Sequence, residues 1–203
     1  MEANGTAAMI DLAFDVDGIE VPADYRYALW EALRQALPWL DDEPAAGIHG
    51  IRTVATDYGM ALLARRARMT LRLPVGRVAA ARVLEGRQID VAANRLMIGA
   101  AHVRELPAAN TLHADFVTTG ADDELAFGKD LAAALAQLDT PCRYICGRRR
   151  TLCADGRELT GYAVAVHGLA AEPSLRLQHA GLGAARKLGC GIFVLHKAIS
   201  GLD

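Results

Sequence analysis

A glycine-rich segment near the end of the chain carries residue types suited to holding a phosphate. It reads Gly181-Leu-Gly-Ala-Ala-Arg-Lys-Leu-Gly-Cys-Gly-Ile-Phe193. Glycines permit positive φ and a close approach of the backbone, and Arg and Lys supply charge that pairs with phosphate oxygens. An ordinary helix-to-strand loop with glycine caps would have a similar composition. The residues that we expect to contact phosphate are Gly181, Gly183, Arg186, Lys187, Gly189 and Gly191.

His49 is the best candidate for proton transfer. It lies in the segment Gly47-Ile-His-Gly-Ile-Arg52, which is predicted to form a loop after the first helix. A loop position predicts an accessible imidazole, and the usual histidine pKa of about 6.5 suits proton transfer at neutral pH. The alternative is an exposed loop histidine with no chemical role.

Two clusters of arginines could bind a polyanion. The first is the run Arg148, Arg149 and Arg150, and the second is Arg65, Arg66 and Arg68. The guanidinium group is a planar fork that pairs phosphate oxygens and stacks on bases. In a strand the side chains of the first run alternate, so at most two share a face. Either cluster could instead be a solvated edge.

The net charge of −2 hides a strong alternation along the chain. Residues 1–50 hold two arginines and ten acidic residues, whereas residues 51–105 hold ten arginines and four acidic residues. Residues 106–140 are again acidic, and residues 141–203 hold nine basic and four acidic residues. Clustering of this kind can place a basic face on a protein that has no net positive charge.

Other features of the composition limit the class of protein. The hydrophobic fraction of 52% is enough to bury a core. No stretch reaches the roughly 18 apolar residues that a membrane helix needs, and no secretory signal is visible, so we expect a cytoplasmic protein. The four cysteines, Cys142, Cys146, Cys153 and Cys190, lack the close pairs typical of zinc sites, so we expect free thiols, no metal and no cofactor.

The hydrophobic pattern predicts the order β-α-β-β-α-β twice. Residues 9–17 alternate strictly between apolar and polar or small side chains, which indicates a half-buried strand. In residues 1–106 we expect a strand at 9–17, a helix capped by Asp24 with the stripe Leu29, Leu33, Leu37 and Leu40, strands at 59–64 and 69–73, a short helix at 76–84 and strand character across 89–103.

The same plan restarts after residue 106. In residues 107–203 we expect a strand at 111–118, a helix capped by Asp122, strands at 142–153 and 157–166 joined by the turn 154–156, a helix opened by Pro173 and a strand at 191–195. The fold class is therefore α+β, with two tandem ferredoxin-like (RRM-like) modules. Ferredoxin-like folds host many unrelated activities, so the site residues must decide the function.

Several motifs together resemble a known family. The pattern Gly-x-Gly-x-x-x-x-x-Gly-x-Gly before an apolar strand resembles the C-terminal glycine-rich loop of the CRISPR-associated repeat-processing endoribonucleases. The segments Gly147-Arg-Arg-Arg-Thr-Leu152, Leu175-Arg-Leu-Gln-His179 and Gly47-Ile-His-Gly-Ile-Arg52 look like its MYXAN-type branch. The resemblance extends from the first strand to Val194.

The resemblance implies an activity and its partners. The family cuts the precursor CRISPR transcript within each repeat and keeps hold of the hairpin product, in company with other Cas subunits of an effector complex. The implied reaction is attack of the RNA 2′-hydroxyl on the neighbouring phosphate, which leaves a 2′,3′-cyclic phosphate and a 5′-hydroxyl without any metal. His49 would transfer the proton, because in several members the catalytic histidine lies shortly after the first helix.

The second catalytic group departs from the family pattern. Some members use a tyrosine in the first helix or a lysine after the histidine, but this chain has no lysine before Lys129. Arg52 is therefore the candidate for stabilising the extra phosphate charge, or this role is absent; the alternative for Arg52 is a surface contact to RNA. Tyr27 is the first choice for a tyrosine partner, ahead of Tyr25 and Tyr58, although its position favours a core role.

Two other classes of protein stay open at this point. One is a non-catalytic subunit that binds an RNA hairpin through the same glycine-rich loop. The other is a ferredoxin-like ligand-binding or regulatory protein in which the arginine runs are incidental.

Overall fold

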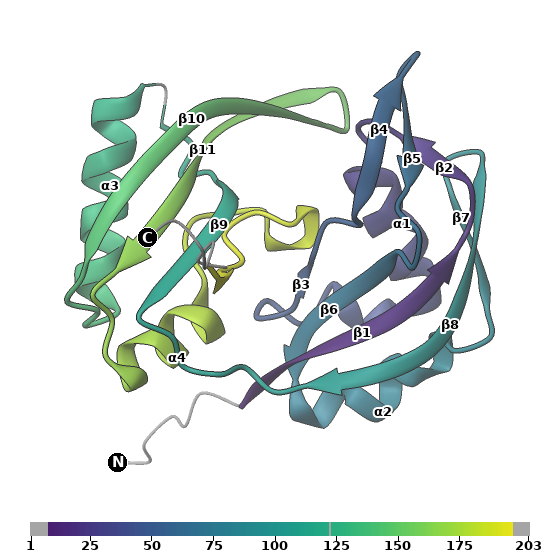
Figure 1. The fold of residues 1–203 in the computed structure, drawn as a ribbon, viewed down its shortest axis with the longest axis horizontal. Coiled ribbons are helices and arrows are strands. Elements are labelled where there is room, and N and C mark those ends of the chain that lie inside the picture. The colour runs from purple at the N-terminus through teal and green to yellow at the C-terminus, as the bar shows by residue number, and fades with distance from the viewer. Residues whose placement is uncertain (1–7, 122, 197–203) are drawn as a thin grey trace, which may run out of the picture. The chain divides into compact units, whose positions relative to one another are not determined.

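The chain folds into two compact units in a computed structural model that describes residues 8–121 and 123–196 (Figure 1). The first unit comprises the described residues up to Leu106, together with 153–157 and 186–189. The second comprises 107–152, 158–185 and the described residues from Cys190 onward. Two pieces of the sequence's second half thus belong to the first unit.

The first unit contains a five-stranded antiparallel sheet in the order β3-β6-β1-β8-β7. Figure 1 shows β1 and β8 running side by side through its middle. The elements of this sheet and its helices are β1 (Met9–Asp17), α1 (Arg26–Ala36), η1 (Pro38–Leu40), β3 (Gly47–Ile48), β6 (Arg68–Pro74), η2 (Val75–Arg77), α2 (Val78–Ala81), η3 (Arg82–Leu84), β7 (Gln88–Val91) and β8 (Asn94–Arg104).

The alternation in β1 separates a core face from a polar face. Leu12 and Phe14 are fully buried in the core of the first unit, with Met69 and Leu71 of β6. Because successive side chains of a strand point to opposite faces, the aspartates of β1 share the other face. The register pairs Asp11 with Arg72 and Asp15 with Arg68. The sheet therefore has one apolar face and one face where opposite charges meet across strands.

The first helix begins and ends differently from the prediction. The residue at its N-cap is Tyr25, without a side-chain cap, because a turn from Pro22 brings Tyr25 into helical conformation. Asp24 therefore lies one residue outside and is not the cap. The four leucines of the predicted stripe are buried, but the α-helix stops at Ala36 because Pro38 disfavours helical backbone in the residue before it.

Two further parts of the first unit were not predicted correctly. The strand expected across 89–103 is a hairpin, with Ala92 at a positive φ in the turn between β7 and β8. The strand expected at 59–64 forms as β5 (Met60–Leu63), but it is not the second strand of the main sheet, a place that β3 takes. It lies instead in a separate three-stranded sheet with the order β2-β5-β4, beside β2 (Glu20–Pro22) and β4 (Thr53–Asp57). Its short strands carry too few residues to show a clear alternation.

The second unit contains a four-stranded sheet in the order β10-β11-β9-β12. Figure 1 shows β10 and β11 as a long green hairpin. Its core includes Leu112, Phe127, Tyr162 and Phe193. The elements are β9 (Thr111–Val117), α3 (Glu124–Gln137), β10 (Arg143–Ala154), β11 (Arg157–His167), α4 (Ala171–Ala180) and β12 (Val194–Leu195), and η4 (Arg186–Leu188) precedes β12 in the chain.

The helix boundaries of this unit shift slightly from the prediction. The cap of α3 is Asp123, whose carboxylate accepts a hydrogen bond from the Ala126 amide at 2.8 Å. Asp122, the predicted cap, lies outside the described residues. Pro173 is the third residue of α4, not the first, because the helix already starts at Ala171.

The two main sheets share one topology. Strands 1 to 4 of the β-α-β-β-α-β plan are β1, β3, β6 and β8 in the first unit and β9, β10, β11 and β12 in the second. In both sheets these strands lie side by side in the order 2-3-1-4, and the first sheet has β7 as an additional edge strand. This is the strand order of the ferredoxin-like unit, so the predicted α+β fold of two tandem ferredoxin-like modules is confirmed. In the part of the chain that the structure describes, no helix is both long and apolar enough to cross a membrane.

Candidate active site

His49 lies directly after β3 and is fixed to the main sheet of the first unit. Gly47 and Ile48 pair with β6, and the His49 amide donates to the Thr70 carbonyl at 2.9 Å. Only 17% of the His49 side chain is exposed, so the expectation of an open, accessible ring is wrong. The two-residue strand β3 carries the ring onto the polar face of the sheet.

Asp11 of β1 lies next to the His49 imidazole. Its Oδ1 lies 3.3 Å from His49 Nε2. Arg72 donates a bidentate pair of hydrogen bonds to the same carboxylate, from Nε at 2.8 Å and from Nη2 at 2.9 Å. The Arg72 side chain is 1% exposed. Burial by itself raises the pKa of Asp11, but the hydrogen bonds from Arg72 and the nearby His49 outweigh it. The pKa of this carboxyl therefore lies well below its usual range.

The basic end of the glycine-rich segment lies in the same part of the first unit. Lys187 Nζ donates to the carbonyls of Glu43 and Ala46, the latter at 3.2 Å. Burial lowers the pKa of Lys187 to about 8, and nearby charge from Arg186 also lowers it. Burial, with a smaller contribution from Arg72, lowers the pKa of Arg186 to about 10. Lys187 therefore shares a pocket with His49, and Arg186 lies close enough to Arg72 and Asp11 to interact with them.

Two neighbouring residues at the start of α1 hold the His49 loop and the basic segment together. The buried Tyr25 hydroxyl donates to the Ile51 carbonyl at 3.1 Å and accepts from the Ile51 amide at 2.6 Å. Arg26 Nη1 donates to the Leu188 carbonyl at 2.9 Å. A narrow crevice between them is lined by Tyr25, Arg26, Leu29, Ile48, His49, Gly50, Lys187 and Leu188.

The glycines of the segment pack closely against the protein's own backbone. Gly189 has φ +81°, and a Cβ there would meet Arg26 Nη1 and lie 2.9 Å from the Ile48 carbonyl oxygen. Gly181 and Gly191 are buried, whereas Gly183 is exposed. The need for glycine at Gly189 is thus explained by the fit to α1 and β3, independently of any phosphate.

The two expected partners of His49 lie elsewhere. Arg52 is exposed and is not among the residues that line the crevice. Tyr27 is half-buried, and its ring packs edge-on against Trp30 at 5.4 Å between centroids. Within the described residues it is Tyr25, not Tyr27, that lies beside His49.

Asp11, Arg72 and Arg26 were missed in the sequence, although one signal was present. Arg72 lies between Leu71 and Leu73 in the strand predicted at 69–73. A charge inside a buried strand needs a partner, and the matching position on the neighbouring strand is Asp11.

The two arginine clusters are exposed. Arg148, Arg149 and Arg150 lie in β10, the edge strand of the second sheet, and all three side chains face solvent. Arg65 and Arg66 lie in the turn before β6, and Arg68 Nε is 3.0 Å from Asp15 Oδ1 in an exposed pair.

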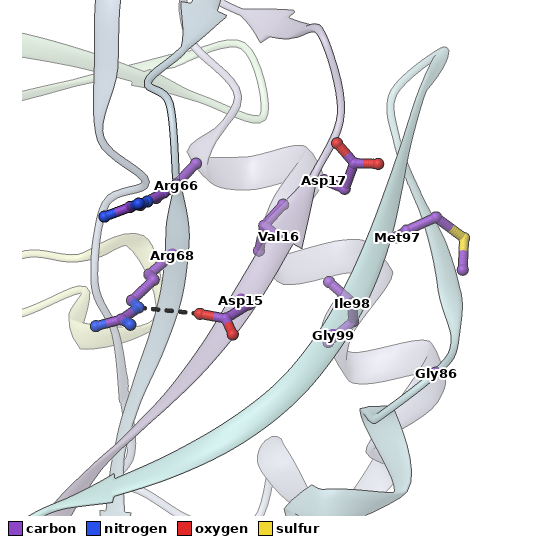
Figure 2. Close-up of a pocket in the computed structure, with 10 residues that line it drawn as sticks. Asp15, Val16, Asp17, Arg66, Arg68, Gly86, Met97, Ile98 and Gly99 are labelled. Atoms are coloured by element: carbon purple, nitrogen blue, oxygen red, sulfur yellow. Dashed lines mark hydrogen bonds and ion pairs between the residues drawn. The ribbon is translucent and has the colours of Figure 1, made fainter.

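A cavity of about 710 Å³ adjoins the second of these clusters. Figure 2 shows Arg66 and Arg68 on one side of β1, with Met97 on the far side of β8. The lining also includes Asp15, Asp17, Ile98 and Gly99. Because both signs of charge line this cavity, its composition alone does not select an anion.

Residues 8–121 and 123–196 contain neither a disulfide nor a candidate metal site. All four cysteines are free thiols. No group of three or more His, Cys, Asp or Glu side chains in these residues could hold a metal ion.

Comparison with known proteins gives concordant results. Residues 10–198 match the family model described as Cas6 Crispr. A curated CRISPR-associated endonuclease Cas6 from Myxococcus xanthus (strain DK1622) is 37% identical over 186 residues, which are 91% of this chain and 80% of that protein.

Solved structures share the fold at much lower identity. A RAMP protein described as binding different RNA substrates has a TM-score of 0.70 at 11% identity, covering 93% of this chain and all of that one. Thermus thermophilus Cse3, bound to an RNA representing a pre-cleavage complex, has a TM-score of 0.54 at 10% identity, covering 92% and 98%. At such identities the likeness concerns the fold alone.

Proposed function

Because this chain belongs to the Cas6 family, we propose that it binds the hairpin of a CRISPR repeat and cuts the precursor transcript within each repeat. The observation that carries this proposal is the meeting of His49 with the basic segment 186–189 in one crevice. The 37% identical Myxococcus xanthus protein, named as an endonuclease, supports it.

The proposed reaction needs a proton acceptor and fixed positive charge, and both are present. His49 takes the proton of the RNA 2′-hydroxyl, the 2′-oxygen bonds to the neighbouring phosphorus, and the bond to the 5′-oxygen breaks. The products are a 2′,3′-cyclic phosphate and a 5′-hydroxyl, and the reaction uses no metal. The charge that builds up on the phosphate is met by Lys187 and Arg186.

The two other residues considered for catalysis take secondary places in this proposal. Arg52 is exposed outside the crevice, so we assign it a contact to the RNA backbone. Tyr27 packs against Trp30 and has a structural role, because the tyrosine beside His49 is Tyr25.

The RNA is held mainly through its phosphates. Arg148, Arg149 and Arg150 on the edge strand would follow the stem, whose deep groove favours recognition by shape and backbone. Arg65, Arg66 and Arg68, with the segment from Gly181 to Gly191, would contact the rest of the repeat. We further propose that the protein keeps its product and joins other Cas subunits in the cytoplasm, where the transcript is made.

Cleavage of the cognate repeat RNA in excess EDTA tests the reaction. We expect full activity in the chelator and products with 2′,3′-cyclic phosphate and 5′-hydroxyl ends. A 2′-deoxy substitution at the nucleotide 5′ to the cut should abolish cleavage, because it removes the nucleophile. Continued cleavage of the deoxy substrate would exclude this mechanism.

The variant His49→Ala tests the assigned residue. Loss of a general acid or base typically slows a reaction by about 10²–10⁴-fold. RNA affinity should change little, because phosphate contacts elsewhere dominate it. If His49→Ala cuts at the wild-type single-turnover rate, His49 is not the catalytic residue. If the wild-type protein binds the hairpin but never cuts it, the protein is a non-catalytic RNA-binding subunit.

A further inference from the structure

The polar face of the first sheet carries two similar arrangements of one carboxylate, one arginine and one histidine. Asp15 contacts Arg68 and the His102 Nε2 atom, both at 3.0 Å, at a site where all three side chains are 42–50% exposed. Asp11 takes two hydrogen bonds from Arg72 and lies 3.3 Å from His49 Nε2, and the exposed fractions of these three side chains are only 1–17%. Burial thus distinguishes a fixed arrangement from a solvated one.

The buried arrangement restricts how His49 can react. Its Nε2 atom is inaccessible to solvent and lies 3.3 Å from Asp11 Oδ1, within ion-pair distance but without the alignment of a hydrogen bond in this structure. An unprotonated Nε2 would set its lone pair against a carboxylate oxygen, so in the neutral ring the proton belongs on Nε2. Nδ1 is then the nitrogen that carries a lone pair.

The Asp11 carboxylate is itself held in place. Arg72 donates hydrogen bonds to both of its oxygens, and this bidentate geometry fixes the plane of the carboxylate as well as its position. The charges that act on Asp11 are those of Arg72 and His49, and Arg186 lies close enough to interact with it. Because cations surround it, the carboxylate stays ionised throughout the neutral pH range.

We propose that Asp11, fixed by Arg72, is the positioning residue of His49: it holds Nε2–H and thereby presents Nδ1 as the atom that takes the proton of the RNA 2′-hydroxyl. The inference rests on the proposed function. In the reaction the 2′-oxygen bonds to phosphorus as Nδ1 gains the proton, and the departing 5′-oxygen takes a proton from water. Asp11 itself never gains a proton, and it stabilises the imidazolium that forms.

Nuclear magnetic resonance of protein labelled with ¹⁵N-histidine tests the contact without any RNA. A buried Nε2–H held by a carboxylate exchanges slowly with water, so the His49 ring proton should be visible in the wild type. The signal is assigned by its loss in His49→Ala. In Asp11→Asn it should disappear or broaden, whereas the matched change Asp15→Asn should leave it in place.

Single-turnover cleavage tests the consequence. Misplacement of a reacting group by about 1 Å costs on the order of 10²-fold, so Asp11→Asn should slow cleavage by about that factor at saturating RNA. RNA affinity should stay nearly constant, because the Asp11 side chain is only 15% exposed. If Asp11→Asn does not fold, the double variant Asp11→Asn with Arg72→Gln removes the unpaired buried charge and serves in its place.

The outcomes separate this inference from the proposed function. A folded Asp11 variant with the wild-type cleavage rate, or one that retains the His49 ring signal, would overturn the positioning role. Cleavage at the wild-type rate by His49→Ala would instead overturn His49 as the catalytic residue. The expected result is loss of both the ring signal and the rate in the Asp11 variant.

Discussion

Gly189 offers the sharpest test of whether the basic segment must lie against the His49 loop. In Gly189→Ala the new methyl group is placed at φ +81°, where an L-residue costs about 1–2 kcal/mol. It also meets Arg26 Nη1 and lies 2.9 Å from the Ile48 carbonyl oxygen. Overpacking of this kind costs about 1–3 kcal/mol more, because Ile48 is backbone in β3 and Arg26 is tied to Leu188.

A matched control isolates the packing contribution. Gly120 has nearly the same φ, +84°, and a Cβ there would have nothing within 4 Å. Gly120→Ala should therefore show only the backbone cost. The difference between the two variants, about 1–3 kcal/mol, corresponds to roughly 2–12 °C in Tm for a chain of this size.

The assay combines thermal unfolding with single-turnover cleavage of the repeat RNA. If the segment 186–189 resists displacement, Gly189→Ala should melt below the Gly120→Ala control. If the segment yields, the stability loss shrinks, but Lys187 moves away from His49 and the cleavage rate falls. Equal melting temperatures together with equal cleavage rates for the two variants would refute the packing argument.

Two further predictions concern the tyrosines of α1 and the edge strand. Tyr25→Phe should lower the free energy of unfolding, measured by urea titration, by about 1–3 kcal/mol, because the Ile51 amide and carbonyl lose their buried partner. The control Tyr27→Phe should lower it much less. Equal losses would contradict the different roles assigned to the two hydroxyls. Replacing both Arg149 and Arg150 with alanine should weaken RNA binding without shifting the cut site. The slope of log K against log salt concentration should become shallower by the equivalent of up to about two phosphate contacts. An unchanged slope and an unchanged affinity would show that these arginines are only a solvated edge.

The sequence determined the plan of the two modules, because that plan depends on local patterns. The alternation of Ile10, Leu12, Phe14 and Val16 is sufficient to predict β1, since a period of two fits only a strand. The hairpin of β10 and β11 follows from its turn at 154–156, where Asp155 and Gly156 both have positive φ. Both arginine clusters lie at the surface, as their charge requires.

Short elements and their exact ends depended on longer-range pairing. The strand β3 has two residues and exists because β6 offers it partners. Asp24 has a suitable side chain for a cap, but the turn from Pro22 decided that the helix starts one residue later. Neither choice is visible in the local pattern.

The surroundings of His49 were decided only by the tertiary structure. The histidine itself was found from its type and its loop, but its neighbours come from distant segments: Asp11 from the first strand, Arg72 from β6 and Lys187 from the glycine-rich segment. Arg52, three residues away in sequence, is exposed and is not among the residues that line the crevice. The register of β1 with β6 places the buried Asp11–Arg72 pair, and the contacts of Arg26 with Leu188 and of Lys187 with Glu43 and Ala46 place the cations. The sequence alone determined which side chain could transfer a proton, and the pairing of strands far apart in the chain determined the charges around it.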